Sequence, residues 1–354
     1  MKVVCISIVP SPYQRDLFKS LSSKIDLSVF YLESESPDSP WPKKHLESYE
    51  SILPGMYWSY RGMRFLINWR IPDITGADLV ILNGYMGIVF QWLLMFKSKS
   101  YKFIFWGEML SDQRQGFKGK IQQWFSNRLK NCVAIVAIGT RAKAKYQSRF
   151  TSIPIFNIPY CCSLQSFQNL PLKKGGQQLN LLFCGQMIYR KGLDILLKAF
   201  ELLATEYNVA LHLVGREAEL NEMMSRLTPA SKKKIFYHGF RAPEDLSVFF
   251  NKADIFILPS RYDGWGVVVN QALGAGLPIV CSDQVGAGLD LIEEGKNGYL
   301  FKSEDVEDLY SKLKIFVDNV ELIPLMSQRA REKSFEITPE KGAERWVQVL
   351  NQLT

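Results

Sequence analysis

Short apolar runs alternate with amphipathic stretches along most of this chain. Residues 2–9, 78–82, 101–106 and 133–138 are runs of the kind found in strands buried on both faces of a parallel sheet. Between them, apolar residues recur at the three- and four-residue spacing of helices. The same alternation resumes at residue 179 and continues to the end of the chain. The pattern predicts an α/β protein with two doubly wound parallel sheets.

Two segments break the alternation. Residues 33–70, rich in Pro, Trp and Tyr, predict a long irregular region of the kind that often carries function. Residues 159–178 are polar, include Lys173-Lys174-Gly175-Gly176, and predict a linker. A last helix is expected after Thr338-Pro339, a good N-cap followed by proline at the first helical position. We therefore expect an N-terminal domain at 1–165, a C-terminal domain at 176–335 and a final helix at 336–354.

One stretch resembles a membrane span. Residues 79–96 are uncharged and almost reach the roughly 20 residues that a span needs. Asn83-Gly84 divides the stretch, so a strand, a turn and a buried helix are expected instead. The first ten residues lack a signal-peptide pattern and predict a buried strand. The six cysteines include no Cys-x-x-Cys pair, which favours reduced thiols.

The positive charge is concentrated in the first half. The chain carries a formal +8; residues 1–165 hold 21 Lys and Arg against 11 Asp and Glu, and the rest holds 22 against 24. A basic half suggests an anionic partner, such as a membrane surface. Residues 117–130 form a basic amphipathic pattern that fits either an anionic bilayer or the surface of the domain. No nucleic-acid-binding module is recognisable, so no nucleic-acid partner is expected.

Residues 253–280 carry the clearest chemical signal. They predict a strand, a glycine loop with Gly264 and Gly266, a short helix and a second strand. Glycines let a ligand approach the backbone, and the N–H groups at the start of the helix attract anions such as a diphosphate. Asp263 and Gln271 lie about two helical turns apart and can face one ligand. The same glycines would also suit an ordinary strand–turn–helix of a parallel sheet.

The stretch RYDGWGVVVNQALGAGLPIV resembles the signature loop of retaining GT-B glycosyltransferases of family 4. Asp263 and Gln271 stand where that family has two glutamates that hold the nucleotide-sugar donor. The resemblance implies two Rossmann-like domains that face a cleft, with the acceptor on the first and the donor on the second. It also implies that the final helix crosses back to the first domain, with Trp346 as a candidate anchor.

A second motif, residues 185–192, resembles the family's diphosphate loop. Lys191-Gly192 matches, Gln186 replaces an arginine, and Arg190 could supply the missing charge. The resemblance implies retention of configuration, a nucleotide-diphosphate sugar as co-substrate, no other cofactor and no metal. Asp263, Lys191 and Arg190 are the expected catalytic residues. The expected donor-binding residues are Gly185, Gln186, Arg241, Gly264, Trp265, Gly266, Val267 and Gln271.

The acceptor is expected at the strand ends of the first domain, where α/β folds bind ligands. The family's histidine near the donor sugar is absent, and Trp106 or Glu108 occupies its neighbourhood. The expected acceptor residues are Ser11, Tyr13, Arg15, Asn83, Tyr85 and Glu108. The acceptor itself is expected to be a glycan or a polyprenyl-diphosphate-linked glycan.

The predicted function is sugar transfer in cell-surface polysaccharide or lipopolysaccharide synthesis, in the cytoplasm or on the inner face of the plasma membrane. The sequence also suggests two rival functions. One is a degenerate relative that binds a nucleotide-sugar or a glycan without transfer, as Gln186, Gln271 and the absent histidine suggest. The other, a dinucleotide-dependent oxidoreductase, is disfavoured because no strand ends in Gly-x-Gly-x-x-Gly.

Overall fold

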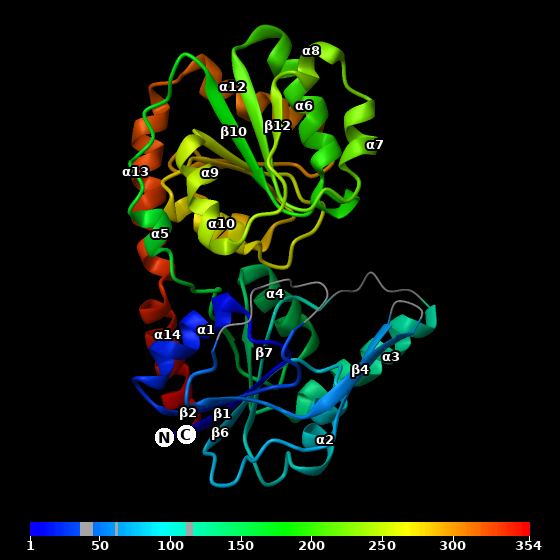
Figure 1. Cartoon of the computed structure of the whole chain (residues 1–354). Helices are drawn as coiled ribbons and strands as arrows, with labels where there is room; N and C mark the ends of the chain where they lie inside the picture. Colours follow the sequence, from blue (N-terminus) through cyan, green and yellow to red (C-terminus); the bar gives the residue numbers. More distant parts are fainter. Residues whose placement is uncertain (36–44, 61–62, 111–115) are drawn as a thin grey trace. The chain divides into compact units, whose positions relative to one another are not determined.

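The computed structural model describes residues 1–35, 45–60, 63–110 and 116–354. The chain divides into two compact units (Figure 1). Unit 1 comprises Met1–Cys162 together with Pro339–Thr354, and unit 2 comprises Ser163–Thr338. Each unit is built on its own parallel sheet, which confirms the predicted α/β class.

Unit 1 contains a seven-stranded parallel sheet in the order β3-β2-β1-β6-β7-β8-β9. The chain runs from β1 outward to β3 and then returns to the other side of β1 with β6. The switch in direction therefore lies between β1 and β6, where open α/β sheets tend to bind ligands. The strands are β1 (Lys2–Ser7), β2 (Asp26–Tyr31), β3 (Glu50–Ile52), β6 (Leu79–Asn83), β7 (Phe103–Gly107), β8 (Ala134–Ala137) and β9 (Ile155–Asn157).

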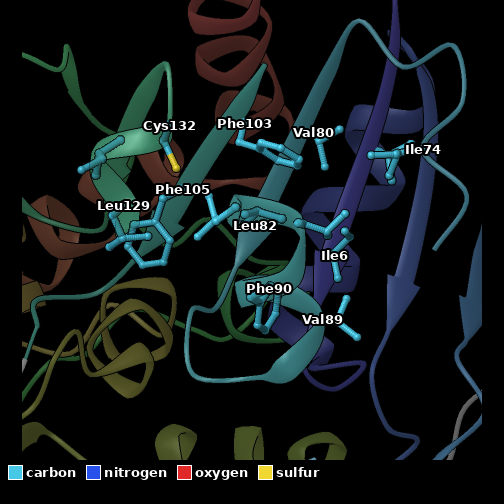
Figure 2. Packing of buried hydrophobic residues seen from close by; sticks show 14 of the residues in the cluster. Ile6, Ile74, Val80, Leu82, Val89, Phe90, Phe103, Phe105, Leu129 and Cys132 are labelled. Carbon is cyan, nitrogen blue, oxygen red and sulfur yellow. The ribbon is translucent and has the colours of Figure 1, made fainter. Parts of the chain in front are cut away.

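Helices cover this sheet and enclose an apolar core. Figure 2 shows part of that core, in which Phe90 from α2 and Leu129 lie among side chains of β6 and β7. Such burial, about 25 cal/mol per Å² of apolar surface, is the main source of stability for the unit. The helical elements are α1 (Pro12–Ser22), α2 (Ile88–Phe96), α3 (Gly116–Ser126), the 3₁₀ turn η1 (Asn127–Asn131), α4 (Thr140–Arg149) and α14 (Pro339–Leu353).

The prediction of an irregular region over residues 33–70 was wrong for much of that segment. Besides β3, it contains β4 (Gly55–Tyr60) and β5 (Met63–Asn68), which pair antiparallel with Gly55 opposite Asn68. Both strands are rich in the aromatic and aliphatic residues that favour β structure, a signal that the sequence interpretation underweighted. Residues 36–44 lie outside the described residues.

Unit 2 contains a six-stranded parallel sheet in the order β12-β11-β10-β13-β14-β15. Its direction switches between β10 and β13, the strands that precede the two predicted motifs. The strands are β10 (Leu179–Cys184), β11 (Val209–Val214), β12 (Ile235–Tyr237), β13 (Ile255–Leu258), β14 (Ile279–Ser282) and β15 (Gly298–Phe301). The helical elements are α5 (Gln165–Gln168), η2 (Tyr189–Lys191), α6 (Leu193–Glu206), α7 (Leu220–Ser225), α8 (Pro229–Lys232), η3 (Pro243–Asp245), α9 (Leu246–Lys252), α10 (Val267–Gly274), α11 (Gly286–Leu291), α12 (Val306–Asp318), α13 (Leu322–Ser334) and η4 (Phe335–Ile337).

Most of the expected linker is packed structure in unit 2. Leu164 precedes α5, and Phe167 belongs to it. Both side chains are buried against Gly274 of α10. Lys173 is also buried, and its Nζ donates to the carbonyls of Phe250 and Asn251 at 2.8 and 2.9 Å. These bonds satisfy carbonyl groups at the end of α9 that would otherwise lack a partner. The segment was expected to be a linker because its composition is polar and its few apolar residues are widely spaced.

The final helix belongs to unit 1, as predicted. α14 lies alongside α1 (Figure 1), and Trp346 is buried with its ring centroid 5.4 Å from that of Trp106. A Cβ at Gly342 would lie 2.6 Å from the Cβ of Cys161, so glycine is needed for this close approach. The prediction of Trp346 as the anchor is confirmed.

The two ambiguous apolar stretches are now placed. Residues 79–96 form β6 and α2, as expected, and no helix in the described part of the chain is long and apolar enough to span a bilayer. Residues 117–130 divide between α3 and η1, and their apolar side chains face in different directions. Leu129 lies in the core, whereas Trp124 is 56% exposed with the Arg128 guanidinium 3.8 Å above its ring.

Candidate functional site

The two predicted motifs meet at the switch point of the unit 2 sheet. Residues 185–192 follow β10 and residues 259–266 follow β13, and these strands pair in parallel. The carboxyl ends of parallel strands lie at one edge of a sheet, so their loops are neighbours. Gly192 has a φ of 68°, and a Cβ there would lie 1.9 Å from the Pro259 carbonyl oxygen. The two loops are therefore in direct backbone contact.

Lys191 lies in η2 and not in the following helix, α6. Gly192, in the left-handed region, separates η2 from α6 and ends the turn. The N–H of Gly192 donates to the Tyr189 carbonyl at 3.0 Å, and that of Lys191 donates to the Ile188 carbonyl at 2.8 Å. This short turn sets the direction of the Lys191 side chain, which a helix would have pointed elsewhere.

An ion pair joins the two motifs. The Lys191 Nζ donates to Oδ2 of Asp263, and the two side chains are 15% and 14% exposed. Arg190 adds a second link, since its Nη1 donates to the Tyr262 carbonyl at 2.9 Å. The three expected catalytic residues thus lie together, with two cationic side chains near one carboxylate. A pair that is mostly removed from water but still accessible can exchange partners when a charged ligand binds.

The Asp263 loop is held from its other side by the start of α11. The Asp263 N–H donates to the Gln284 carbonyl, and its carbonyl accepts from the Gly286 N–H, both at 3.1 Å. A Cβ at Gly286 would lie 2.3 Å from the Gly264 carbonyl oxygen, so only glycine fits there. The backbone that presents the Asp263 carboxylate is therefore fixed.

The glycine loop leads into the N-terminus of α10. Gly266, with a φ of 92°, is the N-cap, and Val267 is the first residue of the helix. The free N–H groups and the dipole of this end favour an anion. Gly264, Gly266 and Val267 thus form the loop and the helix start that the sequence predicts, and their contact with a donor stays a prediction.

Two of the expected donor-binding side chains, those of Trp265 and Gln271, are buried. Trp265 is 1% exposed, and its Nε1 donates to Oδ1 of Asn270 at 3.0 Å. Gln271 is 5% exposed within α10. Trp265 therefore supports the loop from inside, and its ring is not available to a ligand on the surface. The periodicity argument placed Gln271 on the correct helix but could not show its depth.

The remaining donor-binding candidates lie along the same edge. A Cβ at Gly215 would lie 1.9 Å from the Gly185 carbonyl oxygen, so the ends of β10 and β11 touch. Gln186 is partly buried in the loop that follows. Arg241 is exposed, and its Nε donates to the carbonyl of His238 at 3.0 Å. It lies beyond β12, two strands away from β10.

Two thiols border the site but are not nucleophiles. Burial raises the pKa of Cys184 to about 12, although the charge of Lys191 opposes the shift. Burial also raises the pKa of Cys281, and the nearby Asp263 carboxylate adds to the effect. Both thiols are neutral near pH 7, so the reactive thiolate form is not populated. Among the described residues, no cluster of His, Cys, Asp or Glu has metal-binding geometry.

The sequence interpretation missed Arg261, which lies two residues before Asp263. Its guanidinium donates to both carboxylate oxygens of Asp194, at 2.7 and 2.8 Å, and it also pairs with Glu304. Burial opposes the charge of Arg261, but these two carboxylates raise its pKa above the ordinary value. Its partners lie 67 and 43 positions away in sequence, so no local pattern indicated them.

The candidates in unit 1 centre on the switch point between β1 and β6. Oδ1 of Asn83 accepts from the Ser7 hydroxyl at 3.1 Å and from the Gln14 side chain at 2.7 Å. Its Nδ2 donates to the Trp106 carbonyl at 3.0 Å, so Asn83 ties three strands and α1 together. Ser7 and Gln14, which the sequence interpretation did not single out, are parts of this network.

Arg15 is not free to contact a phosphate or an acceptor, contrary to expectation. Its guanidinium donates to Glu50 at 2.6 Å, and the Glu50 side chain is fully buried. Burial raises the pKa of Glu50, but the hydrogen bonds from Arg15 and Tyr31 outweigh it and the net shift is downward. Arg15 is therefore a structural partner of a buried carboxylate.

The other acceptor candidates vary in exposure. Ser11 caps α1 without a side-chain bond, and Tyr13 in the first turn is partly exposed. The Tyr85 hydroxyl accepts from Gln122 at 3.0 Å. Glu108 is exposed, but Trp106 is buried and cannot take the place of the absent histidine.

Comparison with known sequences gives one family-model match, which lies within unit 2, and several related proteins. Residues 167–333 match the family model described as Glycosyl transferases group 1. An uncharacterized glycosyltransferase of Haemophilus influenzae is 29% identical over 222 residues, which is 62% of this chain and 61% of that protein. The lipopolysaccharide 1,2-N-acetylglucosaminetransferase of Salmonella typhimurium is 26% identical over 48% of this chain and 49% of that protein. The poly(ribitol-phosphate) alpha-N-acetylglucosaminyltransferase of Staphylococcus aureus is 25% identical over 47% and 34%. The chain thus spans at most about three fifths of the length of these curated relatives.

Solved structures resemble the whole chain at low sequence identity. The sucrose-phosphate synthase of Thermosynechococcus elongatus has a TM-score of 0.73 at 16% identity, over 100% of this chain and 99% of that one. WaaG, a glycosyltransferase involved in lipopolysaccharide biosynthesis, has a TM-score of 0.68 at 16% identity, over 97% and 98%. Anabaena HepE in complex with UDP has a TM-score of 0.72 at 14% identity, over 99% and 100%. The chain therefore has the GT-B fold, and the match over residues 167–333 supports a GT-B glycosyltransferase.

Proposed function

We propose that the protein is a retaining glycosyltransferase that moves a sugar from a nucleotide-diphosphate donor to a glycan or a lipid-linked glycan. The observation that carries the proposal is the Lys191–Asp263 ion pair, which joins the two motifs beside the N-terminus of α10. Relatives named for lipopolysaccharide and poly(ribitol-phosphate) glycosylation support a role in cell-surface polysaccharide synthesis.

The proposed chemistry follows from the charges at this site. The bond between the anomeric carbon and the phosphate oxygen breaks, so negative charge grows on the nucleoside diphosphate. Lys191, Arg190 and the N–H groups of α10 stabilise that charge, and each such contact contributes about 10²–10³ in rate. Asp263 holds sugar hydroxyls and favours the positive character of the ring. The acceptor oxygen attacks from the same face and its proton passes to the leaving phosphate oxygen, so configuration is retained.

Metal independence is part of this proposal. The two cationic side chains and the helix N-terminus carry the positive charge that a diphosphate leaving group needs. We therefore expect transfer to survive complete chelation of divalent cations. A loss of activity in EDTA that magnesium restores would contradict this part.

An anionic membrane surface is the proposed docking partner of unit 1, on the inner face of the plasma membrane. Residues 79–160 contain 12 Lys and Arg but only two Asp and Glu, which accounts for the positive balance of the first half. Ile88 and Phe96 of α2 are 57% and 63% exposed, and Trp124 of α3 is also exposed. Apolar and basic side chains together favour the interface of an anionic bilayer, where a lipid-linked acceptor would lie. Vesicle pelleting should fall steeply with salt; salt-insensitive binding, or no binding to anionic vesicles, would exclude this surface.

The experiment that tests the function is saturation-transfer NMR against UDP-, GDP-, ADP- and dTDP-sugars, followed for hydrolysis over hours. We expect one donor to bind and to be slowly hydrolysed, and Asp263→Ala and Lys191→Ala each to lower turnover about 10²–10³-fold. Lys233→Ala, at an exposed lysine of the same unit, is the matched control. Unchanged turnover in Asp263→Ala would overturn its assigned role.

The same experiment separates the alternative function, a degenerate GT-B protein that binds without transfer. Gln186 and the buried Gln271 replace charged residues of the family pattern and motivate this alternative. Binding without turnover, even with lipid-linked glycan extracts present, would favour the alternative. Absence of binding to every donor would exclude the transferase and leave only the glycan-binding form of the alternative.

A further inference from the structure

Arg261 connects more segments of the unit 2 site than any catalytic candidate does. Its N–H donates to the Arg190 carbonyl at 2.9 Å, and its Nη1 donates to the Tyr189 carbonyl at 2.5 Å. The guanidinium also stacks 3.6 Å above the Tyr189 ring. Through Asp194 it reaches the first turn of α6, and through Glu304 it reaches the loop after β15. The Arg261 side chain thus joins Tyr189, at the start of the turn that presents Lys191, to α6 and to the loop after β15.

The charge of Arg261 is already neutralised. Two carboxylates, Asp194 and Glu304, accept from its guanidinium. Arg190, by contrast, has only a backbone carbonyl as its partner among the described residues, and Lys191 has one carboxylate. Binding a diphosphate through Arg261 would require breaking a bidentate ion pair. Arg261 is therefore suited to hold the loops in place and poorly suited to bind the donor.

The shape of the guanidinium matters to this role. Its planar fork makes two parallel bonds to Asp194 while its face lies on the Tyr189 ring and Nη1 also reaches the Tyr189 carbonyl. A lysine has the same charge but can neither make a bidentate contact nor stack in this way. The two residues can therefore be distinguished by experiment.

We propose that Arg261 is a positioning residue that locks the turn carrying Arg190 and Lys191 onto the loop carrying Asp263. Its effect on the donor rests on the proposed function, whereas the lock itself does not. Without Arg261, the Tyr189–Lys191 turn keeps its own hydrogen bonds but loses the anchor at its N-terminal end. The Lys191 Nζ then samples positions away from Asp263. The positive charges of Arg190 and Lys191 are no longer held in the positions that a diphosphate needs.

Hydrogen exchange tests the lock without any assumption about function. The Lys191 and Gly192 amides are the reporters, because both are bonded within the turn. In Arg261→Gln and in Arg261→Lys we expect both amides to exchange about tenfold faster, as local opening becomes easier. Amides of β10 should be unchanged, which verifies that the unit remains folded. Arg226→Gln, at an exposed i,i+4 pair with Glu222, is the matched control and should change neither set. Unchanged exchange at Lys191 and Gly192 in Arg261→Gln would overturn the proposal.

Donor affinity tests the consequence. For the nucleotide-sugar that the wild-type protein binds, we expect the Kd to rise about tenfold in both Arg261→Gln and Arg261→Lys, with the product configuration unchanged. Affinity restored to the wild-type value by Arg261→Lys would show that charge alone is needed, and would overturn the positioning role. If the wild-type protein binds no nucleotide-sugar, the proposed function fails, and the exchange experiment still decides whether Arg261 is the lock.

Discussion

Replacing Gly192 by alanine tests whether the two motif loops interlock as described. An alanine Cβ at this position would lie 1.9 Å from the Pro259 carbonyl oxygen and 2.8 Å from its carbonyl carbon. Ordinary contact begins at 3.4 Å, so the loops would have to separate by about 1.5 Å. Both neighbours are backbone atoms at the end of a core strand, and no flexible side chain can yield.

The magnitude follows from two costs. The left-handed conformation, with a φ of 68°, costs alanine about 1 kcal/mol. Forcing apart packed backbone costs a further 1–3 kcal/mol or so, as overpacked cores show. Displacing Gly192 also strains its bonds to Tyr189 and Ile195, each worth about 1 kcal/mol. We expect Gly192→Ala to destabilise unit 2 by about 4 kcal/mol in total.

Gly239→Ala is the matched control. Gly239 has a φ of 75° but no atom within 4 Å of an added Cβ, so only the conformational cost of about 1 kcal/mol applies. Native-state hydrogen exchange at the β10 amides measures the opening of unit 2 in both variants. We expect the two to differ by about 3 kcal/mol, or roughly a hundredfold in exchange rate. A difference below about 1 kcal/mol would refute the interlocked backbone.

Two further predictions concern buried charges. Arg15→Met leaves the buried Glu50 carboxylate without its cation and should destabilise unit 1 by about 3 kcal/mol in urea unfolding. Arg226→Met, which removes an exposed ion pair, should cost under about 1 kcal/mol. Equal losses of stability in the two variants would contradict the structural role of Arg15. Nδ1 of His212 and Nε2 of His238 lie 3.0 Å apart. Burial lowers the pKa of both imidazoles, and neighbouring cationic or imidazole side chains lower it further. Because the unfolded chain then binds more protons, unit 2 should be fully stabilised above about pH 7.5 and lose stability as pH falls through about 6.5; NMR titration midpoints at or above 6.5 would contradict this.

The sequence by itself determined the architecture and the location of the site. Period-two and period-3.6 patterns depend on local burial, so the strands and most helices could be predicted from them. The return of α14 to the first unit was expected only from the resemblance to the GT-B family. The loops after β10 and β13 were identified because their motifs resemble the donor loops of the GT-B family; their glycines alone would also suit an ordinary strand–turn–helix. The β4–β5 hairpin was missed although both strands are rich in residues that favour β structure, because each strand has only six residues and lies in a segment rich in Pro, Trp and Tyr.

Only the tertiary structure decided which side chains act together. Lys191 and Asp263 are 72 positions apart, and their ion pair exists because the sheet brings β13 beside β10. Arg261 has no local signal at all, since its carboxylate partners come from α6 and from the loop after β15. Arg15 follows β1 closely, as a ligand contact would, yet its guanidinium forms an ion pair with a carboxylate 35 positions away. Composition and spacing are properties of neighbours in sequence, whereas ion pairing depends on distance in space, and only the folded chain sets that distance.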